Sequence, residues 1–151
     1  MTECIQAQLQ FSFYRNRRIV AQFDGGQITS DAGLLPLRQF DERHHLTRGW
    51  AAALNDSRPP ERIEHTPQAL LTQRIYQIVA GYEDANDPSL LRHDPIFQLL
   101  VESPPGQPLS SQPTLSRWEN AFTWRDWVSL NRGLLESFGK LCAARVQAAG
   151  E

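Results

Sequence analysis

Helix caps followed by prolines divide much of this chain into short helices. The arrangement occurs at four places: Thr66-Pro67, Asp87-Pro88, Asp94-Pro95 and Ser111-Gln112-Pro113. Thr, Asp and Ser side chains accept hydrogen bonds from the free N–H groups of a first helical turn. Proline is tolerated in that turn because its missing N–H would have no partner inside the helix. The pattern predicts helices at about 67–81, 88–92, 95–101 and 112–121, with Ser110 or Ser111 as the cap of the last one.

Apolar residues at helical spacing support the longer helices. Behind Thr66, one helix face is marked by Leu71, Ile75, Ile78, Val79 and Tyr82. Thr123 is placed to cap a final helix over about 124–145. Its apolar stripe consists of Trp124, Trp127, Val128, Leu134, Leu135, Phe138 and Leu141. Two further helices are expected, one after the caps at 29–31 and one at 47–54.

The N-terminal part has a different period. Residues 9–13 alternate between apolar and polar, and Ile19, Ala21 and Phe23 share one face of a second extended run. The polar residues 14–18 between them predict a turn, so 9–23 is expected to form a β-hairpin. The predicted fold is mainly α: a multi-helix domain of the DNA-binding or dimerisation type with a small N-terminal β-hairpin. The expected boundaries are 1–26 for the β element, 27–146 for the helical domain and 147–151 for a tail.

Composition excludes several classes of protein. The 151 residues carry 15 Lys and Arg against 17 Asp and Glu, a net charge of −2, which excludes a strongly basic nucleic-acid-binding tail. No apolar run approaches the ~20 residues of a membrane span, and the N-terminus has no signal-peptide pattern. Two cysteines, Cys4 and Cys142, are too few for a disulfide framework or a zinc site. A cytoplasmic protein without a membrane partner is expected.

One acidic cluster is a candidate for metal binding or catalysis. It contains Glu83, Asp84, Asp87 and Asp94, with His93 beside them. Carboxylates near a histidine can bind a divalent metal ion or transfer protons. Asp87 and Asp94 each precede a proline, however, so helix capping accounts for both. No catalytic residue, metal ligand or cofactor is therefore predicted.

The helix at 112–121 is the first candidate for DNA binding. Its polar side chains suit base and phosphate contacts: Gln112, Thr114, Ser116, Arg117 and Asn120. Thr114, Arg117 and Asn120 are three residues apart and are expected on one face, opposite Leu115 and Trp118. The apolar helix at 95–101 is a possible packing partner. An ordinary capped surface helix explains the same residues, and the nine-residue loop before it exceeds the ~3–4-residue turn of a helix-turn-helix motif.

The predicted hairpin turn is the second candidate. Arg15, Arg17 and Arg18 make it the most basic segment of the chain. Such a turn can hold phosphate groups, although an exposed basic turn without a partner is an equal alternative. Fourteen of the fifteen basic residues are Arg, a bias that either a GC-rich genome or bidentate phosphate and guanine contacts would produce.

Three blocks of the sequence resemble bacterial insertion-sequence transposases of the DDE type, with insertion-sequence family 1380 the most similar group. The first block is Ile28–Leu35 with Phe40–Arg43. The second is Gln73–Ile78, Gly81–Asp87 and Leu91–Pro95, and the third is Ser111–Arg117 with Glu119-Asn120. The order and spacing of the blocks agree with that family over about residues 20–145.

The resemblance implies a role in DNA transposition. Members of the family place such a helical region before an RNase-H-like domain, whose Asp, Asp and Glu hold two Mg²⁺ or Mn²⁺ ions for strand cleavage and transfer. None of the acids here matches that triad, so the chain is expected to lack the catalytic domain and to be inactive alone. Its expected partner is DNA, at the terminal inverted repeats of the transposon.

A protein–protein module is the alternative function. In this hypothesis the helical domain forms a homodimer or docks on an intact transposase, which it would inhibit. Trp124 and Trp127 in the last helix, with Phe11 and Phe13 in the first strand, are expected to be exposed apolar residues that serve this contact. The near-neutral net charge favours this alternative over strong DNA binding.

Overall fold

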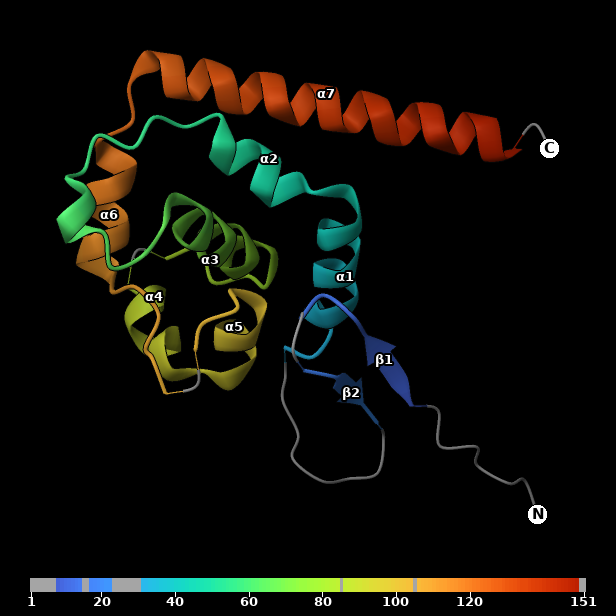
Figure 1. The fold of residues 1–151 in the computed structure, drawn as a ribbon, viewed down its shortest axis with the longest axis horizontal. Coiled ribbons are helices and arrows are strands. Elements are labelled where there is room, and N and C mark those ends of the chain that lie inside the picture. The colour runs from blue at the N-terminus through green and yellow to red at the C-terminus, as the bar shows by residue number, and fades with distance from the viewer. Residues whose placement is uncertain (1–7, 15–16, 23–30, 85, 105, 150–151) are drawn as a thin grey trace.

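The computed structural model describes residues 8–14, 17–22, 31–84, 86–104 and 106–149 (Figure 1). The helices are α1 (Leu34–His44), α2 (Leu46–Ala52), α3 (Pro67–Val79), α4 (Asp87–Leu90), α5 (Pro95–Leu100), α6 (Gln112–Asn120) and α7 (Trp124–Ala149). Two 3₁₀ turns, η1 (Pro60–Arg62) and η2 (Leu91–His93), lie between them. The strands β1 (Leu9–Phe11) and β2 (Ile19–Ala21) form the one sheet of the described residues. The mainly α fold with a small N-terminal hairpin is confirmed.

The cap-and-proline pattern located most helix starts. Thr66 Oγ1 accepts a hydrogen bond from the Ala69 N–H at 3.1 Å, and Asp94 Oδ1 accepts from the N–H groups of Ile96 and Phe97. The prediction for Asp87 is wrong in detail. Asp87 is the first residue of α4 and Asn86 is the cap, because the Asp87 carboxylate accepts from the Asp84 N–H and closes the preceding turn.

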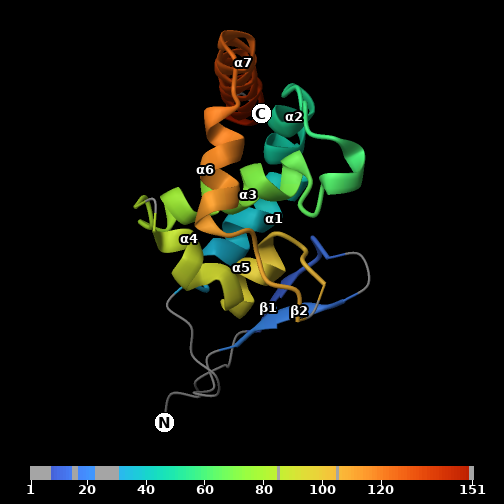
Figure 2. The same ribbon diagram turned by 90° about the vertical axis from the view of Figure 1, so that its left-hand side faces the viewer.

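The hairpin packs its aromatic residues inward. β1 and β2 pair antiparallel with Phe11 opposite Ile19, at the lower end of the molecule in Figures 1 and 2. Phe11 and Phe13 are 8% and 2% exposed and join the core cluster that includes Leu34, Tyr76 and Phe97. The expectation that these two phenylalanines are exposed is therefore wrong. A two-stranded sheet is marginal alone, and this one is stabilised by packing against α1 and α5.

The central helix α3 buries only part of the predicted face. Leu71 is 7% exposed, and Ile75 packs against the same core cluster. Ile78 and Val79 are 49% and 55% exposed, whereas Gln73, Tyr76 and Gln77 are buried. The polar side chains of this face explain the difference. Gln73 and Tyr76 have hydrogen-bond partners on neighbouring elements, so polar groups occupy positions that the apolar pattern assigned to solvent.

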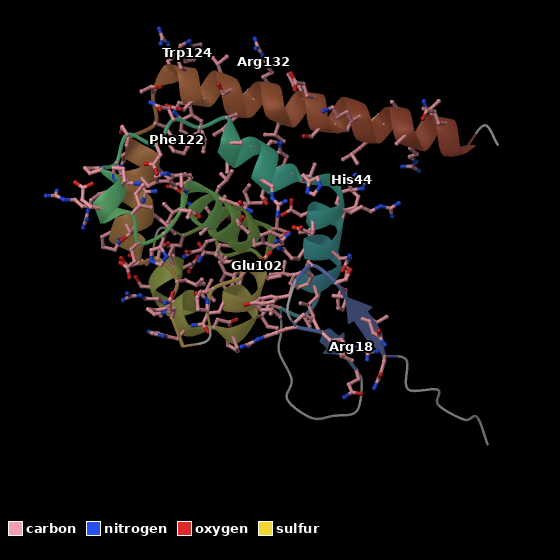
Figure 3. The ribbon with its side chains drawn as sticks, in the orientation of Figure 1. Arg18, His44, Glu102, Phe122, Trp124 and Arg132 are labelled. Atoms are coloured by element: carbon pink, nitrogen blue, oxygen red, sulfur yellow. The ribbon has the colours of Figure 1, made fainter. Side chains whose placement is uncertain are left out.

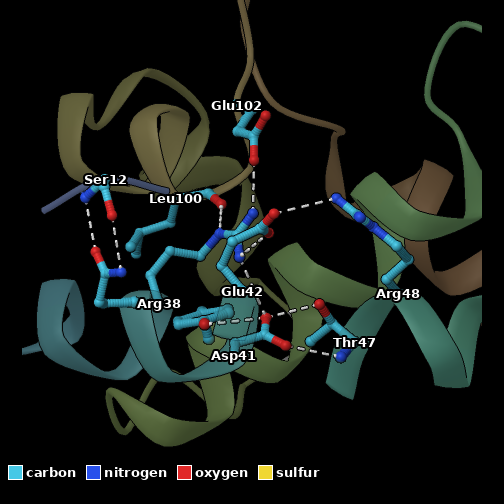
Figure 4. A network of polar contacts seen from close by, with 10 residues as sticks. Ser12, Arg38, Asp41, Glu42, Thr47, Arg48, Leu100 and Glu102 are labelled. Carbon is cyan, nitrogen blue, oxygen red and sulfur yellow. Dashed lines mark hydrogen bonds and ion pairs between the residues drawn. The ribbon is translucent and has the colours of Figure 1, made fainter. Parts of the chain in front are cut away.

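A buried arginine joins α1 to the end of α5 (Figure 4). Arg38 is 3% exposed, and its Nε donates to the Leu100 carbonyl at 2.9 Å. Its Nη2 forms an ion pair with Glu102 at 2.6 Å, and its guanidinium lies 5.4 Å from the centre of the Phe13 ring. Glu102 has a φ of 59°, a left-handed conformation that ends the turn after α5 and places its carboxylate on Arg38.

The neighbouring Asp41 joins three helices. Its carboxylate accepts hydrogen bonds from the Thr47 N–H and Oγ1, at 2.8 and 2.7 Å, and from the Tyr76 hydroxyl at 3.2 Å. These contacts fix the α1–α2 corner on α3 (Figure 4). Burial of the Tyr76 phenol, with the Asp41 charge beside it, raises its pKa far above the ordinary value. Tyr76 therefore stays a hydrogen-bond donor at any physiological pH.

The long helix α7 packs on α2 through small residues. A Cβ atom at Gly133 would lie 2.9 Å from Cδ1 of Trp50, so the close contact requires glycine. Trp50 Nε1 also donates to Ser137 Oγ at 3.1 Å. At the start of α7, Thr123 Oγ1 accepts from the Asp126 N–H while the Asp126 carboxylate accepts from the Thr123 N–H. This confirms Thr123 as the cap.

The apolar stripe predicted for α7 faces away from the body. Trp124 is 78% exposed, Leu135 72% and Phe138 68%, and Figure 3 shows Trp124 and Arg132 pointing outward from the helix. The prediction that the two tryptophans of α7 are exposed is confirmed. Among the described residues, no helix is long and apolar enough to cross a membrane.

Candidate nucleic-acid interface

Two buried polar contacts fix the start of α6. The carboxamide of Gln73 on α3 donates to the Ser110 carbonyl at 3.0 Å and accepts from the Ser110 N–H at 3.1 Å and its hydroxyl at 2.5 Å. One residue earlier, the Leu109 N–H donates to the Arg92 carbonyl, and Arg92 Nε donates back to the Leu109 carbonyl. The backbone N–H and C=O groups of both Leu109 and Ser110 are therefore hydrogen-bonded. The end of the loop that leads into α6 is thus anchored.

One side of α6 is fixed on the body. Leu115 and Trp118 are 3% and 6% exposed and pack in a cluster with Leu70 and Leu71 of α3, as their positions predicted. Glu119 forms an ion pair with Arg74 of α3 at 2.9 Å. The expected packing of α6 on the helix 95–101 is not found, because α5 belongs to the other core cluster. The helix pair α5–α6 is thus not a helix-turn-helix.

The residues proposed for DNA contact fall on two strips of α6. Arg117 and Asn120 are exposed, whereas Gln112, Thr114 and Ser116 are half-buried. Asn120 Nδ2 donates to Ser116 Oγ at 3.3 Å on one strip, and Thr114 lies beside Arg117 on the other, with its hydroxyl 3.0 Å from Ser111 Oγ. The single face expected for Thr114, Arg117 and Asn120 is therefore divided between a groove and open solvent.

The groove lies between α6 and the segment 55–65 and has a volume of about 350 Å³. Thr114 and Arg117 line one wall, and Arg58, Arg62 and His65 line the other. Arg58 is held by Asp56, to which its Nε and Nη2 donate at 2.8 and 2.7 Å. Among the described residues, Arg62 and Arg117 form no ion pair, so two guanidinium groups at this groove are available to an anion.

Two titratable groups of the groove, Asp56 and His65, have shifted pKa values, and Glu64 is a further carboxylate in its lining. The bidentate contact from Arg58 lowers the pKa of Asp56, which keeps that carboxylate paired. Burial lowers the pKa of His65, with the positive charges of Arg92 and Arg58 adding to the effect against an opposing contribution from Glu64. His65 is therefore neutral near pH 7, and the local cationic charge comes from arginine.

Sequence reasoning missed the segment 55–65. It is separated from α6 by about fifty residues along the chain, and it lies beside α6 because Asn55 is tied to the start of α7. The Asn55 N–H donates to Asp126 Oδ1 at 3.0 Å. The signal in the sequence was the pair Arg58 and Arg62 around the prolines of η1, but two basic residues in a loop do not reveal their neighbours.

The basic hairpin turn lies apart from α6. Arg17 and Arg18 are exposed, and Arg15 lies outside the described residues. Figure 3 labels Arg18 at the hairpin, on the lower right, while Phe122 at the end of α6 is at the upper left. The structure therefore does not bring the two candidate DNA-binding regions together on one small patch.

The acidic cluster is held by local backbone contacts. Asp84 Oδ1 accepts from the Asn86 N–H at 2.8 Å, and Asp87 Oδ2 accepts from the Asp84 N–H at 2.9 Å. Asp94 caps α5. In the part of the chain that the structure describes, no group of three or more His, Cys, Asp or Glu residues is arranged to hold a metal ion.

Comparison with known proteins identifies the family. Residues 11–146 match a protein-family model described as "Transposase DDE domain group 1". No curated protein and no solved structure gives a significant match. Because the family model covers nearly the whole chain, from β1 through most of α7, the protein belongs to the DDE transposase family.

Proposed function

We propose that the described part of this chain binds DNA ends during transposition and does not itself cut them. The observation that best supports DNA binding is the position of α6. Buried contacts at Ser110, Leu115 and Trp118 fix this helix, while Arg117 and Asn120 remain exposed. An anchored helix with exposed hydrogen-bond donors is the arrangement that base recognition requires.

The chemistry of the exposed groups suits both parts of DNA recognition. The guanidinium of Arg117, which has no ion-pair partner in the described part of the chain, can donate two hydrogen bonds to guanine or to a phosphate. The carboxamide of Asn120 can pair with adenine. Arg62, across the groove, is placed to contact phosphate and would fix the orientation of α6 without adding sequence information.

The assignment to a particular group of transposases rests on the three sequence blocks. Their order and spacing support membership of insertion-sequence family 1380, with the terminal inverted repeats of the element as the DNA partner. In this proposal the two divalent ions of DDE chemistry are held by a part of the transposase other than the described residues. The proposed DNA partner also implies a cytoplasmic protein.

A gel-shift titration with terminal inverted-repeat DNA tests this function. Arg117→Ala should lose about 1–3 kcal/mol of binding free energy and relax discrimination at one base pair. Arg62→Ala, Arg17→Ala and Arg18→Ala should weaken binding to all sequences alike and reduce its salt dependence. Arg43→Ala is the matched control, because Arg43 is also exposed, on the last turn of α1, which has no part in the groove.

Two results would refute the proposal. One is affinity for inverted-repeat DNA no greater than for an unrelated duplex of equal length. The other is an equal effect of Arg117→Ala and Arg43→Ala on specific binding, which would mean that only overall charge matters.

A further inference from the structure

The amphipathic character of α7 is the reverse of that expected for a surface helix. The half-buried residues on its side toward the body are Ser129, Leu130, Gly133, Ser137 and Leu141, of which only the two leucines are large and apolar. Its outward side carries large apolar residues. Burial of tryptophan and leucine is worth more free energy than burial of glycine and serine, so the outward side is the one that gains most from a partner.

The outward residues repeat with the spacing of a coiled coil. Steps of four and three residues connect the members of this α7 seam: Trp124, Val128, Asn131, Leu135, Phe138 and Cys142. In heptad terms Val128, Leu135 and Cys142 occupy a positions, and Trp124, Asn131 and Phe138 occupy d positions. Of the half-buried residues, Ser129, Leu130, Gly133 and Ser137 occupy b, c and f positions, which point away from the partner, and only Leu141 occupies a g position at the edge of the seam. The body therefore does not obstruct a second helix on the seam.

The exposed area of the seam is sufficient for a specific interface. Trp124, Leu135 and Phe138 are 78%, 72% and 68% exposed, and Trp127 and Leu134 extend the same surface at 49% and 54%. Together these side chains leave on the order of 700 Å² open, close to the ~800 Å² that each partner contributes to a standard interface. An apolar surface of this size on a monomer marks a protein contact.

From this pattern we infer that two copies of the chain associate through their α7 seams as a parallel coiled coil. The polar residue favours a second copy, because Asn131 would meet Asn131 of the other copy, and the two carboxamides could hydrogen-bond to each other beside the existing contact from Asn131 Nδ2 to the Trp127 carbonyl. The charges favour the parallel orientation. An antiparallel pair would place Arg132 against Arg132, whereas a parallel pair places Arg132 against the face of Trp127, a cation–π contact.

Sedimentation of the purified 151-residue chain over a range of concentrations tests the association. The wild type should form a dimer, and Leu135→Glu should weaken it about tenfold or more, because it buries a charge in the seam. Leu90→Glu is the matched control: Leu90 is 82% exposed on α4, away from the seam, and the same substitution there should leave the dimer unchanged. Circular dichroism should show unchanged helix content in both variants.

Thiol cross-linking tests the orientation. In a Cys4→Ser background, a short bifunctional thiol reagent should join Cys142 of one copy to Cys142 of the other. Leu135→Glu should abolish the product at equal protein concentration, and Leu90→Glu should not. A chain that stays monomeric, or a dimer that Leu135→Glu leaves intact, would overturn the inference. A dimer without the Cys142 cross-link would overturn its parallel orientation.

Discussion

Two glutamines on α3 offer a sharp test of how α6 is held. Gln73 and Gln77 lie one turn apart, and both are essentially inaccessible to solvent, at 1% and 0% exposed. Gln73 forms three hydrogen bonds with Ser110, whereas neither side-chain polar atom of Gln77 has a partner among the described residues. Replacing each with methionine keeps the length of the side chain and removes its carboxamide.

The two substitutions should change stability in opposite directions. Gln73→Met removes three hydrogen bonds worth about 1 kcal/mol each, and it leaves the buried N–H and C=O groups of Ser110 unpaired at further cost. We expect a loss of about 3–5 kcal/mol in the free energy of unfolding. Gln77→Met removes a buried amide that has no compensating partner, so we expect a gain of about 1–2 kcal/mol.

Equilibrium urea denaturation, followed by circular dichroism, measures both changes. A domain of this size has roughly 5–15 kcal/mol of stability, so Gln73→Met should remain measurable even where it is severely weakened. Equal destabilisation by the two variants would refute the reasoning, because it would show that the packing of the side chains matters and their hydrogen bonds do not. Destabilisation by Gln77→Met alone would refute it more strongly.

Three further predictions concern the groove, α7 and the chemistry. Burial lowers the pKa of His65 in the folded state below 6.5. As pH falls, the unfolded chain therefore binds a proton at His65 before the folded chain does. The free energy of unfolding should decline from about pH 6.5 down through the lower pKa of the folded state. His65→Gln should flatten that part of the urea-denaturation profile. Gly133→Val should cost about 1–3 kcal/mol of unfolding free energy through its clash with Trp50, whereas Gly139→Val, with open space around it, should cost nothing. With Mg²⁺ or Mn²⁺, the purified chain should neither nick nor join inverted-repeat DNA, because two-metal catalysis needs several converging carboxylates. A denaturing gel of the reaction products measures this. Metal-dependent nicking that Asp84→Ala abolishes would contradict the prediction.

Local signals in the sequence predicted the helix starts well. A cap such as Thr66 or Asp94 acts on N–H groups two or three residues away, so the sequence window contains both partners of the interaction. The same locality explains the hairpin, whose two strands lie close together along the chain. Contacts of this kind do not depend on the rest of the fold.

Burial was harder to predict because its cause is distant. The buried face of α3 is set by Ser110 and Asp41, which lie more than thirty residues from their partners on that helix. The outward face of α7 follows from Trp50, whose ring fits only against glycine on the opposite side of the helix. Apolar periodicity shows that a helix has two unlike faces, but it does not show which face the body covers.

The distribution of charge shows why the net charge of −2 does not decide between DNA binding and a protein–protein contact. Among the described residues, carboxylates form hydrogen bonds and ion pairs within the fold more often than guanidinium groups do. Asp94 caps α5 and Asp126 accepts from the Thr123 and Asn55 N–H groups, neither with an ion-pair partner among the described residues, and Arg38 alone lies near three acids on α1 and the α5 turn. The surface that remains is more basic than the composition suggests, with Arg62 and Arg117 unpaired at one groove among the described residues. Since a DNA phosphate responds to the local potential and not to the total charge of the protein, a nearly neutral chain can carry a DNA-binding surface.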